Sequence, residues 1–157
     1  MNSDTAPVVE EILADEAATV ACGGRLREMI AKAFPSGAVV FLRGNLGAGK
    51  TTLVRGILRS MEFNGAVKSP TYTLLEPYDL VQGQVFHFDL YRLQSPQELE
   101  FIGFDEIFSG PGLKLIEWPE QGNGWLPQAD VEVNLSLCAA ASDETFQRRI
   151  TVRFDEG

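Results

Sequence analysis

The chain contains few residues that commonly form disulfides or bind metals. Its 157 residues include two cysteines, Cys22 and Cys138, and one histidine, His87. Two isolated thiols are too few for the disulfide framework of a small secreted domain or for a Cys/His metal cluster. We therefore expect both cysteines to be reduced thiols in or near the core of a cytoplasmic protein.

Long apolar runs are also missing. No stretch approaches the roughly 18 residues of a membrane-spanning helix. Residues 1–11 are acidic and polar, which is not the pattern of a secretory signal. With 45% hydrophobic residues, the chain can still bury the core of one α/β domain, and its length favours one domain over two. We expect residues 1–10 to be a disordered tail and residues 11–157 to form the domain.

Basic residues are sparse. Thirteen Lys and Arg oppose 22 Asp and Glu, which gives a net charge of −9. Binding to a nucleic-acid backbone needs clustered basic side chains. The only dense group is Arg148, Arg149 and Arg153, and strand alternation places Arg149 and Arg153 on a solvent face. We therefore expect no strong direct binding to nucleic acid. The negative charge suits a basic protein partner, or solubility alone.

One specific motif stands out from this background. Residues 44–51 read Gly-Asn-Leu-Gly-Ala-Gly-Lys-Thr, which matches the phosphate-binding P-loop pattern G-x-x-x-x-G-K-[ST]. The apolar run 38–42 precedes it, and apolar residues at helical spacing follow it over residues 50–61. The strand–loop–helix context favours a nucleoside triphosphate site over a glycine-rich turn with a surface lysine.

The P-loop pattern assigns roles to particular groups. Glycines allow backbone N–H groups to surround the phosphates at a helix N-terminus, where the helix dipole is positive. Lys50 is expected to reach the β- and γ-phosphates, and the Thr51 hydroxyl to bind Mg²⁺. The predicted nucleotide-binding residues are Asn45, Leu46, Gly47, Ala48, Gly49, Lys50, Thr51 and Thr52.

The remaining pattern indicates an α/β fold. We predict a helix from Asp15 to about Phe34, a buried strand over 113–116, and short helices starting at Pro96 and Phe104. Two antiparallel pairs add to these: a strand over 84–89 with residues 72–78, and residues 130–138 with 146–154. The predicted fold is a single P-loop NTPase-type domain whose mixed sheet has an antiparallel extension.

Two acids end apolar strands. A P-loop enzyme needs a second acid for Mg²⁺, usually at the end of the neighbouring strand, and Glu117 has this place. We favour this metal role over a carboxylate that merely caps the strand. Asp89 ends the other strand and is a candidate to orient the attacking water or support the metal; a purely structural Asp is nearly as compatible with the pattern.

Five further residues remain open. Arg92 could touch phosphate or pair with Asp89. His87 shares a strand face with Asp89, although a structural histidine fits better. Thr71 and Thr73 suit a loop that senses the γ-phosphate, or simply a strand. Trp118 follows Glu117 and either covers the site or packs in the core.

The nucleotide and reaction follow from what is absent. No Asn-Lys-x-Asp occurs, so the usual guanine-reading motif of small GTPases is missing and ATP is favoured. The expected reaction is slow hydrolysis of MgATP to ADP and phosphate. Arg43 and Arg92 are the only candidates for an internal arginine finger, which predicts low intrinsic turnover.

The motifs together resemble the bacterial TsaE family. Besides the P-loop, the resemblance is carried by Ser-Pro-Thr-Tyr-Thr-Leu at 69–74, His-Phe-Asp-Leu-Tyr-Arg at 87–92, Glu-Leu-Glu at 98–100 and Ile-Glu-Trp-Pro at 116–119. The matches run in order from about residue 12 to 154.

This resemblance implies a small P-loop ATPase in the threonylcarbamoyladenosine modification of tRNA. It implies two partners, TsaD and TsaB, of which TsaD carries the transferase chemistry. It also implies that Lys50 binds phosphate, that Thr51 and Glu117 bind Mg²⁺, and that Asp89 is a catalytic-site acid. The segment 69–73 resembles the family's switch-like loop, and the segment 15–19 is similar to the part that approaches adenine.

Two alternatives belong to other classes. A small-molecule kinase has a similar size and the same P-loop, but usually carries an arginine-bearing lid, whereas the acidic stretch 92–112 holds only Arg92. A non-catalytic nucleotide-sensing module would bind ATP without a water-orienting acid. Asp89 and Glu117 argue weakly against it.

Overall fold

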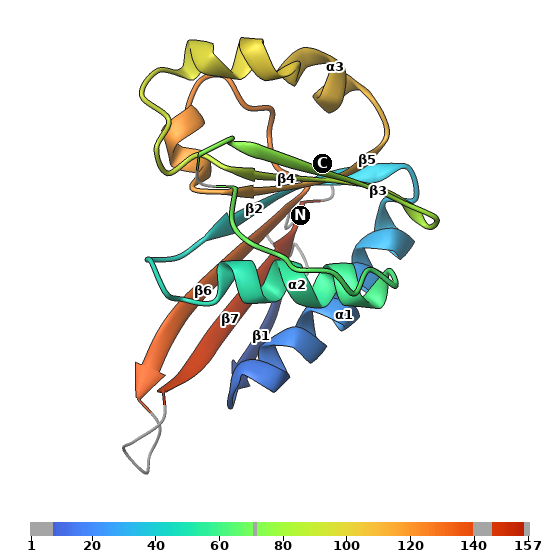
Figure 1. Ribbon diagram of the computed structural model, residues 1–157. Helices are drawn as coiled ribbons and strands as arrows, with labels where there is room; N and C mark the ends of the chain where they lie inside the picture. The colour runs from blue at the N-terminus through green and yellow to red at the C-terminus, as the bar shows by residue number, and fades with distance from the viewer. Residues whose placement is uncertain (1–7, 71, 140–145, 156–157) are drawn as a thin grey trace, which may run out of the picture.

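The computed structural model describes residues 8–70, 72–139 and 146–155. They form one seven-stranded sheet with helices on both faces (Figure 1). Within these described ranges, no helix combines the length and apolarity needed to cross a membrane.

The sheet is mixed, as the sequence predicts. Its central strands are parallel: β2 pairs with both β5 and β6, and β5 pairs with β4. Antiparallel strands extend it at both edges, β3 beside β4 and the pair β7 and β1 beside β6. The spatial order is β1-β7-β6-β2-β5-β4-β3. The strands are β1 (Val8–Leu13), β2 (Gly37–Arg43), β3 (Leu75–Leu80), β4 (Gly83–Asp89), β5 (Gly112–Glu117), β6 (Val131–Ala139) and β7 (Phe146–Phe154).

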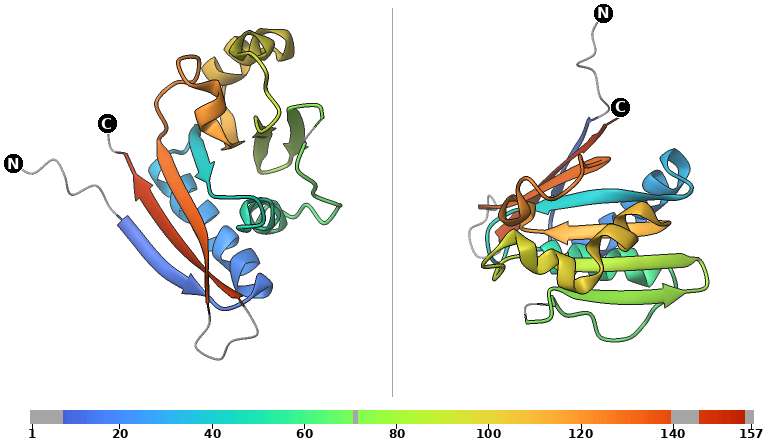
Figure 2. Two further views of the ribbon diagram at one scale, coloured as in Figure 1. Left: turned by 90° about the vertical axis from the view of Figure 1, so that its left-hand side faces the viewer. Right: turned by 90° about the horizontal axis from the view of Figure 1, so that it is seen from above.

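The helices form two separate layers. Helices α1 (Glu16–Ala33) and α2 (Lys50–Ser60) lie together on one face, and the 3₁₀ helix η1 (Pro96–Ile102) and α3 (Phe104–Ser109) lie on the other (Figure 2). Each face has its own apolar core: Leu53 and Ile57 belong to the first, and Leu99 and Phe104 to the second. The buried parallel strands between these layers therefore hold the loops at their carboxyl ends in fixed places.

Local signals explain where the helices begin. The side chain of Asp15 caps α1 by accepting a hydrogen bond of 2.8 Å from the amide of Ala18. Ser95 and Glu98 form a capping box at the start of η1. The sequence predicts both starts. The helix that starts at Pro96, η1, differs from the expectation only in its 3₁₀ geometry. A further 3₁₀ turn, η2, spans Pro119–Gly122.

Helices α1 and α2 approach each other closely at glycines. A Cβ added to Gly23 would lie 2.6 Å from the carbonyl oxygen of Leu53, and one added to Gly56 would lie 2.2 Å from that of Val20. Glycine lowers stability within a helix, and this close approach explains why it stands at both positions, because a side chain there would overlap the other helix. This contact fixes α2, and with it the P-loop, against the rest of the domain.

We expect Gly56→Ala to destabilise the protein strongly. The new methyl group would overlap backbone atoms of α1, so the helices must separate, and we expect a loss of about 3 kcal/mol in the free energy of unfolding. Gly24→Ala is the matched control, because its Cβ would lie 3.4 Å from the nearest atom, Ser60 Cβ. Alanine there should be neutral or stabilise by about 0.5–1 kcal/mol. Urea unfolding of both variants measures the difference; equal stabilities would contradict the close approach.

Two sequence predictions need correction. The predicted tail over residues 1–10 is wrong for its last three residues, since strand β1 begins at Val8 and pairs with β7 from Val8↔Arg153 to Leu13↔Arg148. Residues 1–7 lie outside the described ranges. The strand predicted over 72–78 instead spans Leu75–Leu80. Leu74 has a φ of 68°, and its amide bonds to the carbonyl of Pro70, so the chain turns before the strand starts.

Candidate nucleotide-binding site

The candidate site lies where the parallel strands end and α2 begins. The P-loop follows β2, while Asp89 and Glu117 end β4 and β5 and are register partners in the sheet. A cavity of about 450 Å³ opens here. Its lining consists of Leu46, Gly47, Gly49, Lys50, Thr51, Thr52, Ser69, Asp89, Tyr91, Arg92, Glu117, Trp118 and Arg148.

The P-loop has the predicted position. Gly49 caps the start of α2 with a φ of 108°, a left-handed conformation that favours glycine. Most of the eight predicted nucleotide-binding residues line the cavity. Asn45 and Ala48 are outside that lining: Ala48 is buried, and its amide bonds to the carbonyl of Asn45 at 3.0 Å, which closes the turn.

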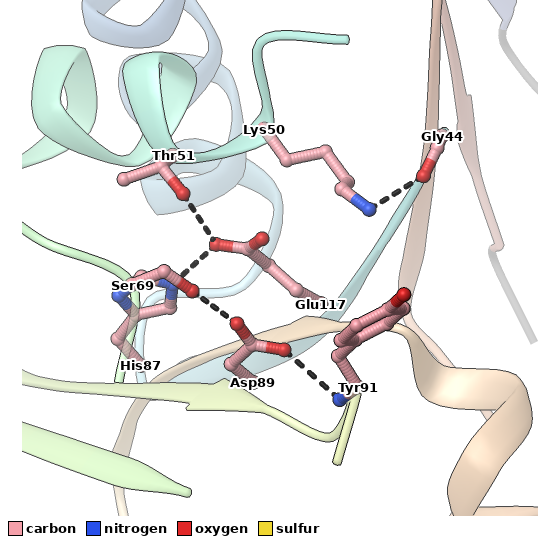
Figure 3. Close-up of polar contacts among 8 residues, drawn as sticks. All are labelled: Gly44, Lys50, Thr51, Ser69, His87, Asp89, Tyr91 and Glu117. Atoms are coloured by element: carbon pink, nitrogen blue, oxygen red, sulfur yellow. Dashed lines mark hydrogen bonds and ion pairs between the residues drawn. The ribbon is translucent and has the colours of Figure 1, made fainter. Parts of the chain in front are cut away.

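Lys50 is held inside the loop. Its side chain is buried, and its Nζ donates to the carbonyl of Gly44 (Figure 3). The same atom lies 3.7 Å from the centre of the Trp118 ring. Burial lowers the pKa of Lys50, while the nearby carboxylates of Glu117, Asp89 and Glu120 act in the opposite direction. The ammonium group is therefore placed at the cavity by a carbonyl and a ring, neither of which neutralises it. Trp118 lines the cavity and also packs against the apolar core of the η1 and α3 face, so the structure combines its two predicted roles.

Glu117 connects the P-loop to β4. Its Oε2 accepts a hydrogen bond of 3.1 Å from the Thr51 hydroxyl and lies 2.7 Å from Nε2 of His87 (Figure 3). Both Glu117 and His87 are buried. The structure thus brings together the two predicted metal ligands. His87 does not line the cavity, and its contact with Glu117 agrees with the structural role that the sequence favours. Only Nε2 has a partner, because Nδ1 is buried with no hydrogen-bond partner among the described residues.

Asp89 is fixed by two donors. The hydroxyl of Ser69 donates to Oδ2, and the amide of Tyr91 donates to Oδ1 at 3.0 Å (Figure 3). Asp89 is buried yet lines the cavity. The loop that follows α2 is therefore joined to this acid through Ser69. A carboxylate can accept further hydrogen bonds, so Asp89 retains the capacity to bind water.

The structure separates the remaining candidates. Arg92 lines the cavity and lies 5.1 Å from the Tyr72 ring. Arg43 lies outside the cavity lining and pairs with Glu120 and Glu132. Thr73 is exposed and bonds to the carbonyl of Leu75. Thr71 lies outside the described residues.

Sequence reasoning missed Arg148. The sequence places Arg149 and Arg153 on a solvent face and assigns Arg148 only to the same basic group. In the structure, the Arg148 side chain lines the cavity and donates to P-loop carbonyls. Alternation holds the signal that could have found it. Arg148 has the same parity along β7 as Ile150 and Val152, which are buried.

The donor set fits Mg²⁺ bound with a triphosphate. Mg²⁺ prefers oxygen ligands, and usually takes one or two from the protein and the rest from phosphates and water. Thr51 and Glu117 present two such oxygens beside the P-loop amides. No cluster of three or more His, Cys, Asp or Glu that could hold a metal occurs among residues 8–70, 72–139 and 146–155.

Comparison with known proteins identifies the family. The model of the family described as "Threonylcarbamoyl adenosine biosynthesis protein TsaE" matches residues 13–150. The chain belongs to the TsaE family. The resemblance that the motifs indicate is thereby confirmed, and so is a role in tRNA threonylcarbamoyladenosine biosynthesis.

Individual members are similar over most of the chain. A TsaE protein of Haemophilus influenzae is 46% identical over 126 residues, which cover 80% of each chain. A TsaE protein of Rickettsia felis is 39% identical over 114 residues, 72% of this chain and 66% of that one. The crystal structure of Bacillus subtilis YdiB has a TM-score of 0.69 at 27% identity and covers 98% of this chain and 90% of that chain. TsaE-family similarity therefore extends across the P-loop and both strand-end acids.

Proposed function

We propose that this chain is the ATP-binding and slowly ATP-hydrolysing component of the tRNA threonylcarbamoyladenosine system. One observation carries the proposal. Lys50, Thr51, Asp89 and Glu117 come from three parts of the chain and meet in one cavity at the N-terminus of α2. A P-loop needs this combination of a cation, a hydroxyl and acids for phosphoryl transfer to water.

Each group at the site has a separate role in the proposed reaction. Lys50 exchanges the carbonyl of Gly44 for phosphate oxygens, since an ammonium donor binds an anion more strongly than a neutral carbonyl. The P-loop amides stabilise charge that develops on the transferred phosphoryl group. Thr51 and Glu117 would hold Mg²⁺, which when bound neutralises charge on the β- and γ-phosphate oxygens. Asp89, fixed by Ser69 and Tyr91, would orient the attacking water.

Intrinsic turnover should be low because the arginines nearest the site are held by other groups. Arg148 lines the cavity but donates to P-loop carbonyls. Arg43 is held in two ion pairs away from the cavity lining, and Arg92 lies at the cavity against Tyr72. An additional positive charge supplied by a partner protein commonly completes such a site. We propose that TsaD-like and TsaB-like proteins are these partners, acting in the cytoplasm where the tRNA is.

Phosphate release tests the proposal directly. The purified chain is incubated with Mg²⁺ and either ATP or GTP, alone and with the TsaD-like and TsaB-like proteins of the same organism. We expect slow release from ATP, weaker use of GTP, and an increase when the partner pair is added. Release that depends on a small-molecule acceptor would indicate a kinase. ATP binding without release under any condition would indicate a sensing module.

We expect the isolated protein not to bind tRNA measurably near physiological salt. Its net charge is −9, and backbone neutralisation supplies most nonspecific affinity. The dense basic group at residues 148–153 offers little positive charge to a nucleic acid, because Arg148 faces the P-loop and Arg149 pairs with Glu10 at 3.3 Å. Fluorescence titration with tRNA measures this. A micromolar complex that weakens with salt would contradict it.

A further inference from the structure

Arg148 contacts two carbonyl groups of the P-loop and also lines the cavity. Its Nε donates to the carbonyl of Ala48 at 3.2 Å, and its Nη2 lies 3.4 Å from the carbonyl of Gly47. These residues are about a hundred positions apart in the chain. The guanidinium therefore links the antiparallel edge of the sheet, through β7, to the loop proposed to bind phosphate.

Gly49 makes this approach possible. A Cβ at Gly49 would lie 3.0 Å from Nε and 3.2 Å from Cδ of Arg148, so the arginine lies directly against the space where a side chain would be. Gly49 thus has two requirements, its left-handed φ of 108° and room for Arg148. Two independent features, the hydrogen bonds and the packing, define the same contact.

The direction of the contact indicates its role. A loop that surrounds phosphate must turn its N–H groups inward, so its carbonyls face outward and need other donors. The planar guanidinium supplies two donors in a fixed geometry, which holds two successive carbonyls at once. A lysine in the same place is a single point charge and cannot fix both.

We propose that Arg148 is a positioning residue that keeps the P-loop amides directed at the phosphates before ATP binds. This inference rests on the proposed function, because it concerns the same site. It assigns Arg148 an effect on affinity rather than on the chemical step. Bound ATP itself holds the loop in the competent conformation, so the cost of losing the preformed loop falls on ATP binding. Such a loss raises KM and leaves kcat nearly unchanged.

The test compares Arg148→Gln and Arg148→Lys with Arg149→Gln. Arg149 is the matched control because it is the next residue in β7, carries the same charge, and is exposed toward Glu10. If the competent loop conformation falls to about a tenth of the population, the dissociation constant for ATP rises about tenfold. We expect the full rise in the dissociation constant for Arg148→Gln and most of that rise for Arg148→Lys. The kcat of both variants should stay within about twofold of wild type. Arg149→Gln should change neither quantity.

Amide hydrogen exchange distinguishes a local change in the P-loop from a loss of stability of the whole domain. We expect faster exchange at residues 45–50 in both Arg148 variants without nucleotide, and unchanged exchange in α1 and β2. Wild-type affinity in Arg148→Gln, or restoration of affinity by Arg148→Lys, would overturn the inference. If wild-type protein itself fails to bind ATP, the proposed function is wrong, whereas loop exchange still reports whether Arg148 holds the P-loop.

Discussion

Replacing Lys50 with alanine is expected to reduce phosphate release from ATP by about 100-fold or more and to weaken ATP binding. Lys50 is the buried cation at the cavity, and its Nζ already lies between the carbonyl of Gly44 and the Trp118 ring. Phosphate oxygens can replace the Gly44 carbonyl as the partner of Nζ. No other residue of the P-loop supplies a positive charge to the β- and γ-phosphates. Steady-state phosphate release and equilibrium ATP binding measure the two effects.

Lys32→Ala is the control for Lys50→Ala. Lys32 lies exposed in the last turn of α1, so its loss changes the net charge equally without touching the cavity. We expect wild-type hydrolysis from this variant. The thermal unfolding of both variants is also measured. If Lys50→Ala loses hydrolysis but unfolds like the wild type, the loss comes from the missing side chain and not from a misfolded domain. Hydrolysis at the wild-type rate by Lys50→Ala would refute the P-loop assignment.

Glu117→Gln and Asp89→Asn are expected to fail in different ways. The Glu117→Gln substitution retains the shape of the side chain but removes the negative charge that would hold Mg²⁺ beside Thr51. We therefore expect hydrolysis to fall about 100-fold and the Mg²⁺ concentration for half-maximal rate to rise. Asp89→Asn should leave nucleotide and Mg²⁺ binding intact and lower kcat, because an amide nitrogen in place of a carboxylate oxygen no longer accepts a proton from water.

Magnesium titrations at saturating ATP separate these two roles. Glu120→Gln is the control, since Glu120 is exposed, follows the same strand and pairs with Arg43 outside the cavity lining. A Glu117→Gln titration that overlays the wild-type curve would remove Glu117 from the metal site. A raised Mg²⁺ requirement in Asp89→Asn would instead assign Asp89 to the metal.

The helices and central strands could be predicted because their signals are local. Asp15 and Ser95 cap the helices that follow them, and the P-loop pattern fixes the order of strand, loop and helix. Strand β1 had no such signal. Its residues Val8–Leu13 do not alternate, and they form a strand because β7, far away in the chain, offers a free edge. Pairing energy of this kind belongs to two segments together and is not encoded in either one alone.

For the site, the candidate groups can be named from the sequence alone. The P-loop spacing identified Lys50 and Thr51, and strand ends identified Asp89 and Glu117, because phosphate binding and strand termination both follow from neighbouring residues. The residues that support them depend on how distant segments pack together. His87 beside Glu117, Ser69 on Asp89 and Arg148 on the P-loop carbonyls are contacts between segments that 20 to 100 positions of chain separate. Sheet order and register set those contacts, and they arise only when the whole chain packs.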